Sequence, residues 1–336
     1  MRAFEHVNAA SVDDILATLG EDWQTRIIAG GTDLLPLMKE QIIAPSRLVN
    51  IKNAPDLVRF DFNPDNGLTV GAVVTLDKVA RNPAVQQYYT VLAESIGVSA
   101  SPQLRNMATL VGNLLQASRC WYFRGPFLCW LKGGEKCYAA SGENRLHAIF
   151  GHSRCNSAHP SDPAPALIAL GAKVTIYRQG GESRSESLES FFALPTDERR
   201  RETVLRPDEI VVDVLLPPQP AEAHGTYLKA MARETWAFAL ASVAVHGVWD
   251  GPVAREINVV LGGVAPIPWR SREAEDVVRG QPIDGNLARR AGEAAVANAR
   301  PLKQNGYKVE LVRTLVERAL LTASAPTKRK RRSAAA

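Results

Sequence analysis

Apolar and polar positions in the first fifty residues alternate between helical and extended spacing. Residues 13–20 (DDILATLG) repeat apolar side chains with helical spacing, carry two aspartates in the first turn and end at a glycine. The short apolar run from Arg26 to Ala29 predicts a strand, which a double glycine and a helix-like stretch follow. Residues 46–52 (SRLVNIK) predict another strand. The first segment is therefore expected to form a βαβ-like unit.

The middle of the chain mixes both kinds of spacing. Residues 67–83 predict a strand, a turn at Gly71 and a helix that Pro83 ends. Further along, the patterns predict a helix and a loop in 89–116, a helix and a strand in 161–179, a short helix in 186–194 and a strand in 209–220. Prolines end that last strand, and the stretch 217–220 is the predicted domain boundary.

The last third predicts a sheet that carries helices. The second half of residues 224–271 alternates apolar and polar positions and contains turn signals, which favours antiparallel strands. Residues 286–300 and 309–323 have strong helical spacing. The predicted class is therefore α+β, and no internal repeat is visible.

Composition and charge narrow the class of protein. The chain has 336 residues, 46% hydrophobic and 22% charged, which is typical of a globular protein of two or three domains. We see no signal peptide and no apolar run long enough to span a membrane. The net charge of +5 resides in Lys328–Arg332, predicted to be a solvated, disordered end; a docking arm for an acidic partner is the alternative. The body lacks a basic surface with interleaved aromatics, so no nucleic acid is expected.

A glycine-rich loop follows the first predicted apolar strand. In Ala29–Leu35 (AGGTDLL), adjacent glycines let the backbone adopt unusual φ values and approach a ligand closely. Successive N–H groups in such a loop can surround a diphosphate. The pattern is neither GxGxxG nor GxxxxGK[ST], which excludes the Rossmann and Walker motifs. A tight turn without a ligand and a phosphate-binding loop both remain open.

A second candidate loop lies just before the cysteines. Residues 106–113 (NMATLVGN) place Thr109 and Asn113 as side-chain donors beside Gly112. Two such loops would suit a long ligand with a diphosphate at its centre. The alternative is a turn whose polar groups only cap local structure.

All four cysteines lie in one segment, with the spacing C-x8-C-x7-C-x17-C from Cys120 to Cys155. A zinc ribbon has two tight cysteine pairs, which are absent here. Disulfides favour small domains in an oxidising compartment. Four thiolates also suit a [4Fe–4S] cluster, whose cysteines can come from an irregular loop. The cluster, a structural zinc ion, and disulfides or free thiols all remain open on chemistry alone.

Five blocks of sequence, in order, resemble a known family: IIAGGTDLLPLMK, QLRNMATLVGNLL, HPSDPAPALIALGA, YLKAMARETWAFALASVA and LGGVAPIPWRSREAE. They are similar to the FAD-binding (medium) subunits of the xanthine dehydrogenase and aldehyde oxidoreductase family of molybdenum hydroxylases. The resemblance implies a two-part FAD-binding domain of the vanillyl-alcohol-oxidase (PCMH) type over residues 1–219, divided at residues 57 and 58. It implies a smaller α+β C-terminal domain of the CO dehydrogenase flavoprotein type over 222–323, and leaves 324–336 as the basic tail.

The resemblance also implies which residues contact FAD. Matching positions on the two loops and three further sites are Ile27, Ile28, Ala29, Gly30, Gly31, Thr32, Asp33, Leu34, Thr109, Gly112, Asn113, Asp162, Ile210 and Lys229. Ile210 and Lys229 match positions near the isoalloxazine ring. A lysine there would stabilise an anionic reduced ring, whereas the alternative for Lys229 is an ordinary surface lysine.

A subgroup of the family carries a cysteine insertion that this chain resembles over residues 119–156. The resemblance implies that Cys120, Cys129, Cys137 and Cys155 bind a [4Fe–4S] cluster. Five aromatic residues between them are then expected to shield it or to form a small core: Trp121, Tyr122, Phe123, Phe127 and Trp130. His147 and His152 are expected to be polar neighbours rather than ligands.

The implied function is electron transfer within a complex, with aldehydes as the expected substrates. The family places the molybdenum cofactor on a large partner subunit and [2Fe–2S] clusters on a small one, and FAD passes electrons to an external acceptor. The alternatives are the FAD subunit of a xanthine dehydrogenase or 4-hydroxybenzoyl-CoA reductase, and a non-redox scaffold with a four-cysteine zinc site. The compartment is expected to be the cytoplasm, or the periplasm if a partner carries the export signal.

Overall fold

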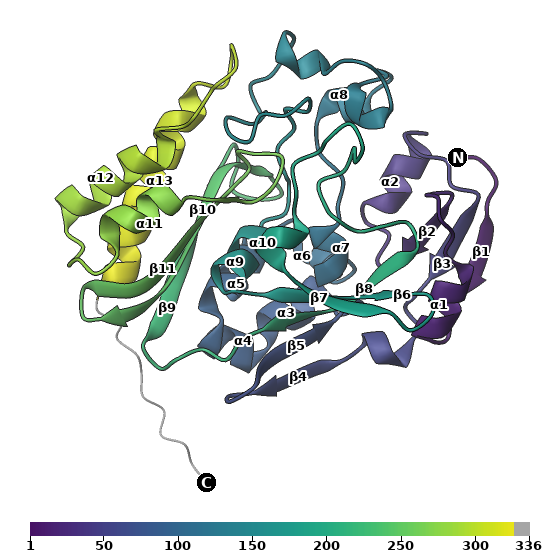
Figure 1. Ribbon diagram of the computed structural model, residues 1–336, viewed down its shortest axis with the longest axis horizontal. Coiled ribbons are helices and arrows are strands. Elements are labelled where there is room, and N and C mark those ends of the chain that lie inside the picture. The colour runs from purple at the N-terminus through teal and green to yellow at the C-terminus, as the bar shows by residue number, and fades with distance from the viewer. Residues whose placement is uncertain (326–336) are drawn as a thin grey trace.

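The computed structural model describes residues 1–325, which form three sheets with helices packed against them (Figure 1). The purple N-terminal sheet lies at one end, the five-stranded sheet in the middle and the green and yellow C-terminal unit at the other end. The basic stretch 328–332 lies outside the described residues. Within those residues, no helix has the length and apolar character needed to cross a membrane.

The first sheet confirms the expected βαβ arrangement. Its three strands are all parallel, in the order β1-β3-β2. Its elements are β1 (Glu5–Asn8), α1 (Val12–Thr18), β2 (Thr25–Ile28), α2 (Leu34–Lys39) and β3 (Arg47–Asn50). The Ser11 side chain caps α1 by accepting a hydrogen bond from the Asp14 N–H. β2 ends at Ile28, two residues before Gly30, so the sheet fixes where the glycine-rich loop starts.

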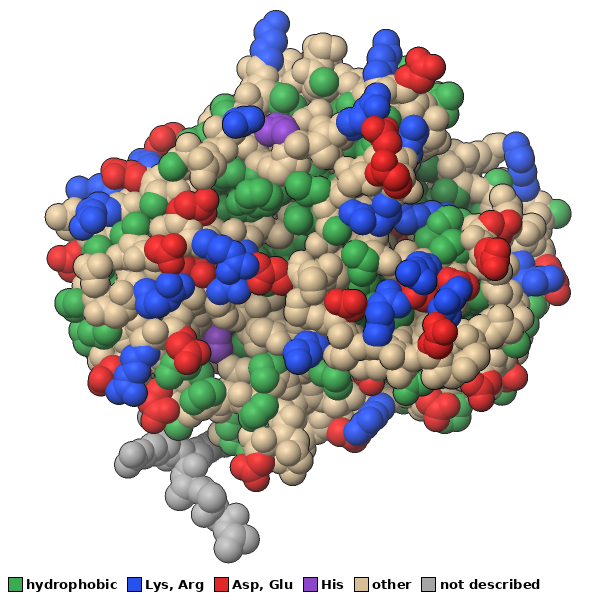
Figure 2. Space-filling view, in the orientation of Figure 1, with side chains coloured by type: hydrophobic (Ala, Val, Ile, Leu, Met, Phe, Trp, Pro, Cys, Tyr) green, Lys and Arg blue, Asp and Glu red, His purple; other side chains and the backbone are tan. Residues whose placement is uncertain are grey.

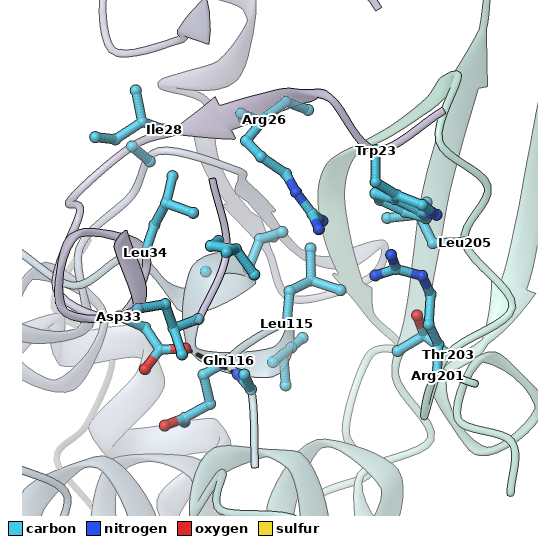
Figure 3. A pocket seen from close by; sticks show the side chains of 18 of the residues that line it. Trp23, Arg26, Ile28, Asp33, Leu34, Leu115, Gln116, Arg201, Thr203 and Leu205 are labelled. Carbon is cyan, nitrogen blue, oxygen red and sulfur yellow. Dashed lines mark hydrogen bonds between the residues drawn. The ribbon is translucent and has the colours of Figure 1, made fainter. Parts of the chain in front are cut away.

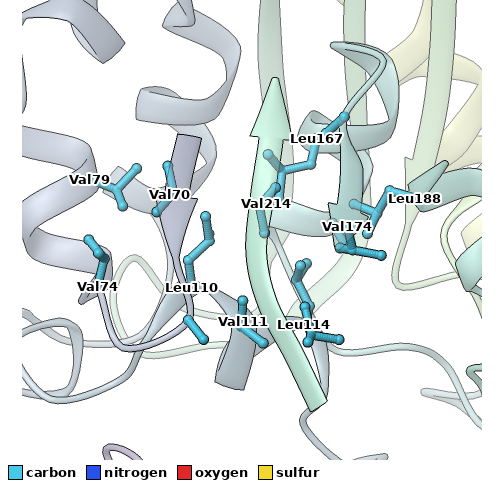
Figure 4. Close-up of a cluster of buried hydrophobic side chains, with 14 of the residues drawn as sticks. Val70, Val74, Val79, Leu110, Val111, Leu114, Leu167, Val174, Leu188 and Val214 are labelled. Atoms are coloured by element: carbon cyan, nitrogen blue, oxygen red, sulfur yellow. The ribbon is translucent and has the colours of Figure 1, made fainter. Parts of the chain in front are cut away.

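The middle sheet is antiparallel, in the order β4-β5-β8-β6-β7. Its strands are β4 (Phe60–Asn63), β5 (Gly67–Gly71), β6 (Lys173–Arg178), β7 (Ser183–Ser187) and β8 (Glu209–Leu216). β8 lies at its centre because its side chains are almost all apolar and buried. Figure 4 shows its Val214 close to Leu167 and Val174 in the core of this domain.

Short helices cover the middle sheet. They are α3 (Leu76–Arg81), α4 (Pro83–Tyr88), α5 (Thr90–Gly97), α6 (Pro102–Arg105), α7 (Leu110–Leu114), α9 (Pro163–Ala169) and α10 (Leu188–Phe191), with a 3₁₀ turn at Pro55–Leu57. The expected end of a helix at Pro83 is confirmed, because α3 ends at Arg81 and Asn82, which precedes the proline, is extended. Pro83 also starts α4, where a missing N–H costs nothing, and Asn82 caps that helix.

The C-terminal unit is an antiparallel sheet with three helices on one face, as the alternating pattern and the two helical stretches predict. The strands, in the order β12-β11-β10-β9, are β9 (Ala223–Met231), β10 (Ala239–Asp250), β11 (Val253–Gly262) and β12 (Trp269–Arg270). The helices are α11 (Arg272–Val278), α12 (Gly285–Val296) and α13 (Tyr307–Ser324). The helix-covered face of this sheet forms a second core, whereas Tyr227, Ala244 and Val260 of the same sheet belong to the core of the first half of the chain.

The cysteine segment is irregular, as expected, and joins the two halves. It contains α8 (Trp121–Arg124) and 3₁₀ turns at Trp130–Lys132 and Tyr138–Ala140. Its last part belongs to the C-terminal unit, because Ile149 and Phe150 are buried in that unit's core. Asn305 Nδ2 also donates to the carbonyl oxygens of His147 and Ala148. Figure 1 shows the segment, with α8, arching over one side of the molecule.

The free energy of unfolding is expected to rise between about pH 7 and pH 9 because of Lys308. Its buried amino group donates to the carbonyl oxygens of Leu146 and Gly263, and burial lowers its pKa from 10.5 to about 7. In this range the unfolded chain binds a proton that the folded chain does not, so raising the pH opposes unfolding by at most about 1.4 kcal/mol per pH unit. Denaturant unfolding of wild type and Lys308→Met checks this, since the variant should lose that slope; equal slopes would contradict it.

Candidate functional site

A cavity of about 480 Å³ lies between the first sheet and the middle sheet. All eight loop residues from Ile27 to Leu34 line it, together with Thr109, Gly112 and Ile210. These positions come from segments up to about 180 residues apart, so only the fold brings them together. Eleven of the fourteen positions expected to contact FAD therefore line one cavity of the size typical for cofactors.

The double glycine is required by a close backbone approach. A Cβ atom on Gly30 would lie 2.0 Å from the Met107 carbonyl oxygen, so no side chain fits there. Gly31 has φ +70°, which other residues rarely adopt. The first loop thus packs backbone to backbone against the start of the second, where the Thr109 hydroxyl accepts a hydrogen bond from the Gly112 N–H. This geometry favours a ligand-holding pair of loops over an isolated tight turn.

Two arginines give the cavity a positive side that the sequence patterns did not reveal. Arg26 and Arg201 lie on the ring of Trp23, with their guanidinium carbons 4.9 Å and 3.4 Å from its centroid. Burial lowers the pKa of both, that of Arg201 to about 10 with Arg26 adding repulsion, and the Nε of Arg26 is buried without a partner. Figure 3 shows both guanidinium groups opposite Asp33 across the cavity. An anionic ligand would relieve this repulsion, which fits FAD.

A carboxyl group also lines the cavity next to Arg201. Burial raises the pKa of Glu202 to about 7, so this group is partly protonated near neutral pH. The other two carboxylates on the lining, Asp33 and Glu209, are already paired with arginines that do not line the cavity. The cavity therefore offers more positive than negative charge to its ligand.

Three expected FAD contacts, Asn113, Asp162 and Lys229, are not on the lining of the cavity. The ammonium group of Lys229 is buried 2.8 Å from the carboxylate of Asp162, which also accepts hydrogen bonds from Ser99 and Tyr227. The Asn113 side chain accepts a hydrogen bond from the Ser161 hydroxyl. Lys229 is therefore neither a surface lysine nor exposed to the cavity: it neutralises a buried carboxylate beneath the loops.

The four cysteines line a second, small cavity, together with mostly aromatic side chains and with Arg154 and Ser157. Cys120, Cys129, Cys137 and Cys155 all carry free thiols, so no disulfide forms among them. Of the five aromatic residues expected to enclose them, Tyr122, Phe123 and Trp130 line this cavity, whereas Trp121 and Phe127 do not, and the lining also includes Tyr138 and Leu131. Trp121 instead packs on His147, and Phe127 packs on Tyr122 and Tyr138.

Three of the thiols have polar side chains as neighbours. His147 Nε2 lies 3.2 Å from the Cys120 sulfur, Asn156 Nδ2 donates to Cys137 at 3.4 Å, and the Ser157 hydroxyl lies 3.3 Å from Cys155. Burial raises the pKa of Cys120 to about 11 and that of Cys155 to about 12.

Thiols with such pKa values remain protonated at neutral pH, unlike those of reactive or catalytic cysteines. His152, the other expected neighbour, bonds Asn156 and a backbone carbonyl. In residues 1–325, no group of three or more His, Cys, Asp or Glu side chains is arranged to hold a single metal ion.

The two cavities share a wall. Phe123, which precedes Cys129 in the chain, and Leu131, which follows it, line both cavities. The cysteine segment and the residues just before it also contribute Ala117, Ser118 and Lys132 to the larger cavity. Sequence patterns alone give no distance between the two sites; in the structure the cysteines lie next to the cavity of the glycine loops.

Two family models together match nearly the whole described chain. Residues 2–219 match the FAD binding domain in molybdopterin dehydrogenase, and residues 226–323 match the CO dehydrogenase flavoprotein C-terminal domain.

Known proteins of similar length match as well. The aldehyde oxidoreductase FAD-binding subunit PaoB of Escherichia coli K12 is 38% identical, over 89% of this chain and 92% of that protein. The nicotine 6-hydroxylase medium subunit of Paenarthrobacter nicotinovorans is 27% identical over 97% of this chain and 99% of its own. A chain of carbon monoxide dehydrogenase from Hydrogenophaga pseudoflava has the same fold, with a TM-score of 0.76 at 24% identity, covering 96% of this chain and 97% of its own.

Proposed function

Because the chain belongs to the family of FAD-binding subunits of molybdopterin dehydrogenases, we propose that it is the electron-transferring subunit of a molybdenum-containing aldehyde oxidoreductase. The expected family, the expected fold class and the assignment as an oxidoreductase subunit are confirmed by the two family matches and the 38% identical relative. A non-redox scaffold is therefore the wrong class.

The proposed partners are a large subunit with the molybdenum cofactor and a small subunit with [2Fe–2S] clusters. FAD, when bound, takes up electrons from such a partner and delivers them to an external acceptor. The residues of this chain bind and orient it: the two glycine loops hold the diphosphate by backbone N–H groups, and Arg26 and Arg201 balance its negative charge. The complex works in the cytoplasm, or in the periplasm if a partner carries the export signal.

Aldehydes are the proposed substrates because of the relative with the higher identity. PaoB, named as an aldehyde oxidoreductase subunit, is 38% identical to this chain, whereas the xanthine dehydrogenase FAD-binding subunit of Escherichia coli O157:H7 is 23% identical. The substrate pocket itself would lie on the large subunit.

The four cysteines support a [4Fe–4S] cluster as a second redox group. A zinc ion needs four sulfurs about 2.3 Å from one centre, and the described residues hold no such convergent set. A cubane instead binds each cysteine at a different iron, so its ligands surround a volume. Four free thiols around one shielded cavity, three with polar neighbours, fit that arrangement.

Purified with its partner subunits, the chain is expected to be brown and to show flavin absorption bands above a broad iron–sulfur absorption. Metal and flavin analysis of this subunit should give about four irons for each FAD. A colourless, zinc-containing preparation would contradict the proposed redox function. A yellow preparation with FAD and no iron in this subunit would contradict only the cluster.

A further inference from the structure

Asp33 joins the FAD-binding loop to the cysteine segment, and we propose that it couples FAD binding to the filling of the cysteine site, so that each strengthens the other. The inference rests on the proposed iron–sulfur function, because the filling is by iron. It concerns the positioning of two loops, a role that Asp33 has in addition to its place on the lining of the cavity.

Three contacts connect Asp33 to the start of the cysteine segment. Its carboxylate lies 2.7 Å from Arg119 Nη1 and 2.8 Å from Arg124 Nη2, and it accepts a hydrogen bond from the Ala117 N–H at 2.8 Å. The carboxylate is only 17% exposed. Partly buried, charge-assisted bonds of this kind are stronger than surface ion pairs. The dashed line in Figure 3 is the hydrogen bond from the Ala117 N–H, next to Gln116, to the Asp33 carboxylate.

The carboxylate makes these contacts instead of capping its own helix. Asp33 is the residue that precedes α2, yet its side chain bonds no N–H of that helix. At the same position, Ser11, Thr75 and Asp284 each cap their helices with a side-chain oxygen. The start of α2 thus gives up a local bond and gains one to a segment 84 residues away.

Arg124, which contacts Asp33, also fixes the backbone around Cys120. Arg124 ends α8, the helix that begins directly after Cys120, and it also donates to the carbonyl oxygens of Ser118 and Ala117. The Ser118 hydroxyl in turn accepts a hydrogen bond from the Cys120 N–H. The backbone around Cys120 is thus folded onto the guanidinium that Asp33 holds.

Charge explains why the contacts of Asp33 with Arg119 and Arg124 couple the glycine loop and the cysteine segment in both directions. Arg119 and Arg124 both contact the Asp33 carboxylate, so their guanidinium groups lie close enough to repel each other without it. If the cysteine segment loosens, the carboxylate loses both cations while still adjoining the loop meant for a diphosphate. A bare negative charge there opposes FAD. By thermodynamic reciprocity, bound FAD must favour the ordered segment by the same factor.

The test measures the dissociation constant of FAD for the full chain with and without iron. FAD is removed, flavin fluorescence is titrated, and iron is taken out of half of the sample by a chelator under reducing conditions. Iron removal is expected to weaken FAD binding about tenfold in wild type. In Asp33→Asn, which has no negative charge to leave unpaired, FAD binding should change by less than about twofold when iron leaves. Arg124→Gln, which removes a partner on the cysteine side, should behave likewise.

Asp197→Asn is the matched control. Asp197 is a carboxylate that also holds the cysteine segment, through Trp130 Nε1 and Arg154, but it lies outside the glycine loop. This variant should keep the tenfold response. An iron-loaded wild type whose FAD affinity is unchanged by iron removal would overturn the coupling and leave the proposed function intact. A response retained in both Asp33→Asn and Arg124→Gln would also overturn it, and wild type without iron would overturn the cluster and the coupling together.

Discussion

Gly30→Ala is expected to raise the dissociation constant of FAD by about 10- to 100-fold. The new methyl carbon would lie 2.0 Å from the Met107 carbonyl oxygen and 2.7 Å from its carbon, both backbone atoms of the second loop. The two loops must separate to make room, and strain of this kind costs about 1–3 kcal/mol. Since both loops are needed for the diphosphate, separating them weakens the contacts that each loop makes with FAD. Flavin fluorescence titration of the variant measures the effect.

Gly20→Ala provides the control for Gly30→Ala, because it makes the same chemical change in the same part of the chain. A Cβ there meets nothing closer than 4.0 Å, so FAD binding should stay at the wild-type level. Circular dichroism of both variants separates loss of the site from loss of the fold. Wild-type affinity in Gly30→Ala would mean that FAD is held elsewhere.

Cys129→Ser is expected to remove nearly all iron from the chain and the broad absorption with it. The side chain of Cys129 is buried within the four-cysteine cavity, and a serine hydroxyl is a poor substitute for a thiolate on iron. Without the metal, a segment of about 35 residues loses its internal cross-link, so the thermal midpoint should fall by several degrees. Iron analysis, visible spectra and thermal unfolding of the variant measure these effects.

Ser141→Ala, at an exposed position of the same segment, should change none of these quantities. Undiminished iron in Cys129→Ser would refute the assignment of the ligands. Turnover of the assembled complex adds a distinction that iron content cannot make. If Cys129→Ser is less stable but turns over normally when folded, the cluster pins the segment and does not carry electrons in turnover.

Local sequence patterns predicted most of the fold where burial and periodicity agree. β8 and α9 are apolar and bounded by prolines or glycines, so their positions could be read directly. β7 could not, because Ser183–Ser187 is polar throughout and becomes a strand only by pairing with β6. Pro83 ends a helix as expected, but its second role as the first residue of α4 becomes visible only with the cap at Asn82.

In the candidate site, too, some residues could be predicted from local sequence and others could not. The glycine loops were predictable, because a close backbone approach leaves no residue but glycine. Arg26 and Arg201 were not, since they are far apart in the chain and meet only on the face of Trp23. The one local signal was the arginine in the segment TRII of β2, because a charged residue in a partly buried strand usually has a binding or pairing role. The burial of Lys229 against Asp162 is likewise a property of the folded chain.

The attachment of Ile149 and Phe150 to the C-terminal core sets the limit for removing the cysteine segment. As a stretch of sequence the insertion covers residues 119–156, but as a part of the fold it ends earlier, because residues 144–150 are bound by the C-terminal helices and sheet. A deletion of the whole stretch would leave a hole in a second domain. An engineered version without the cysteine cavity would have to be cut between about residue 119 and residue 143, with Cys155 replaced separately, and the remaining piece would serve as a tether between domains.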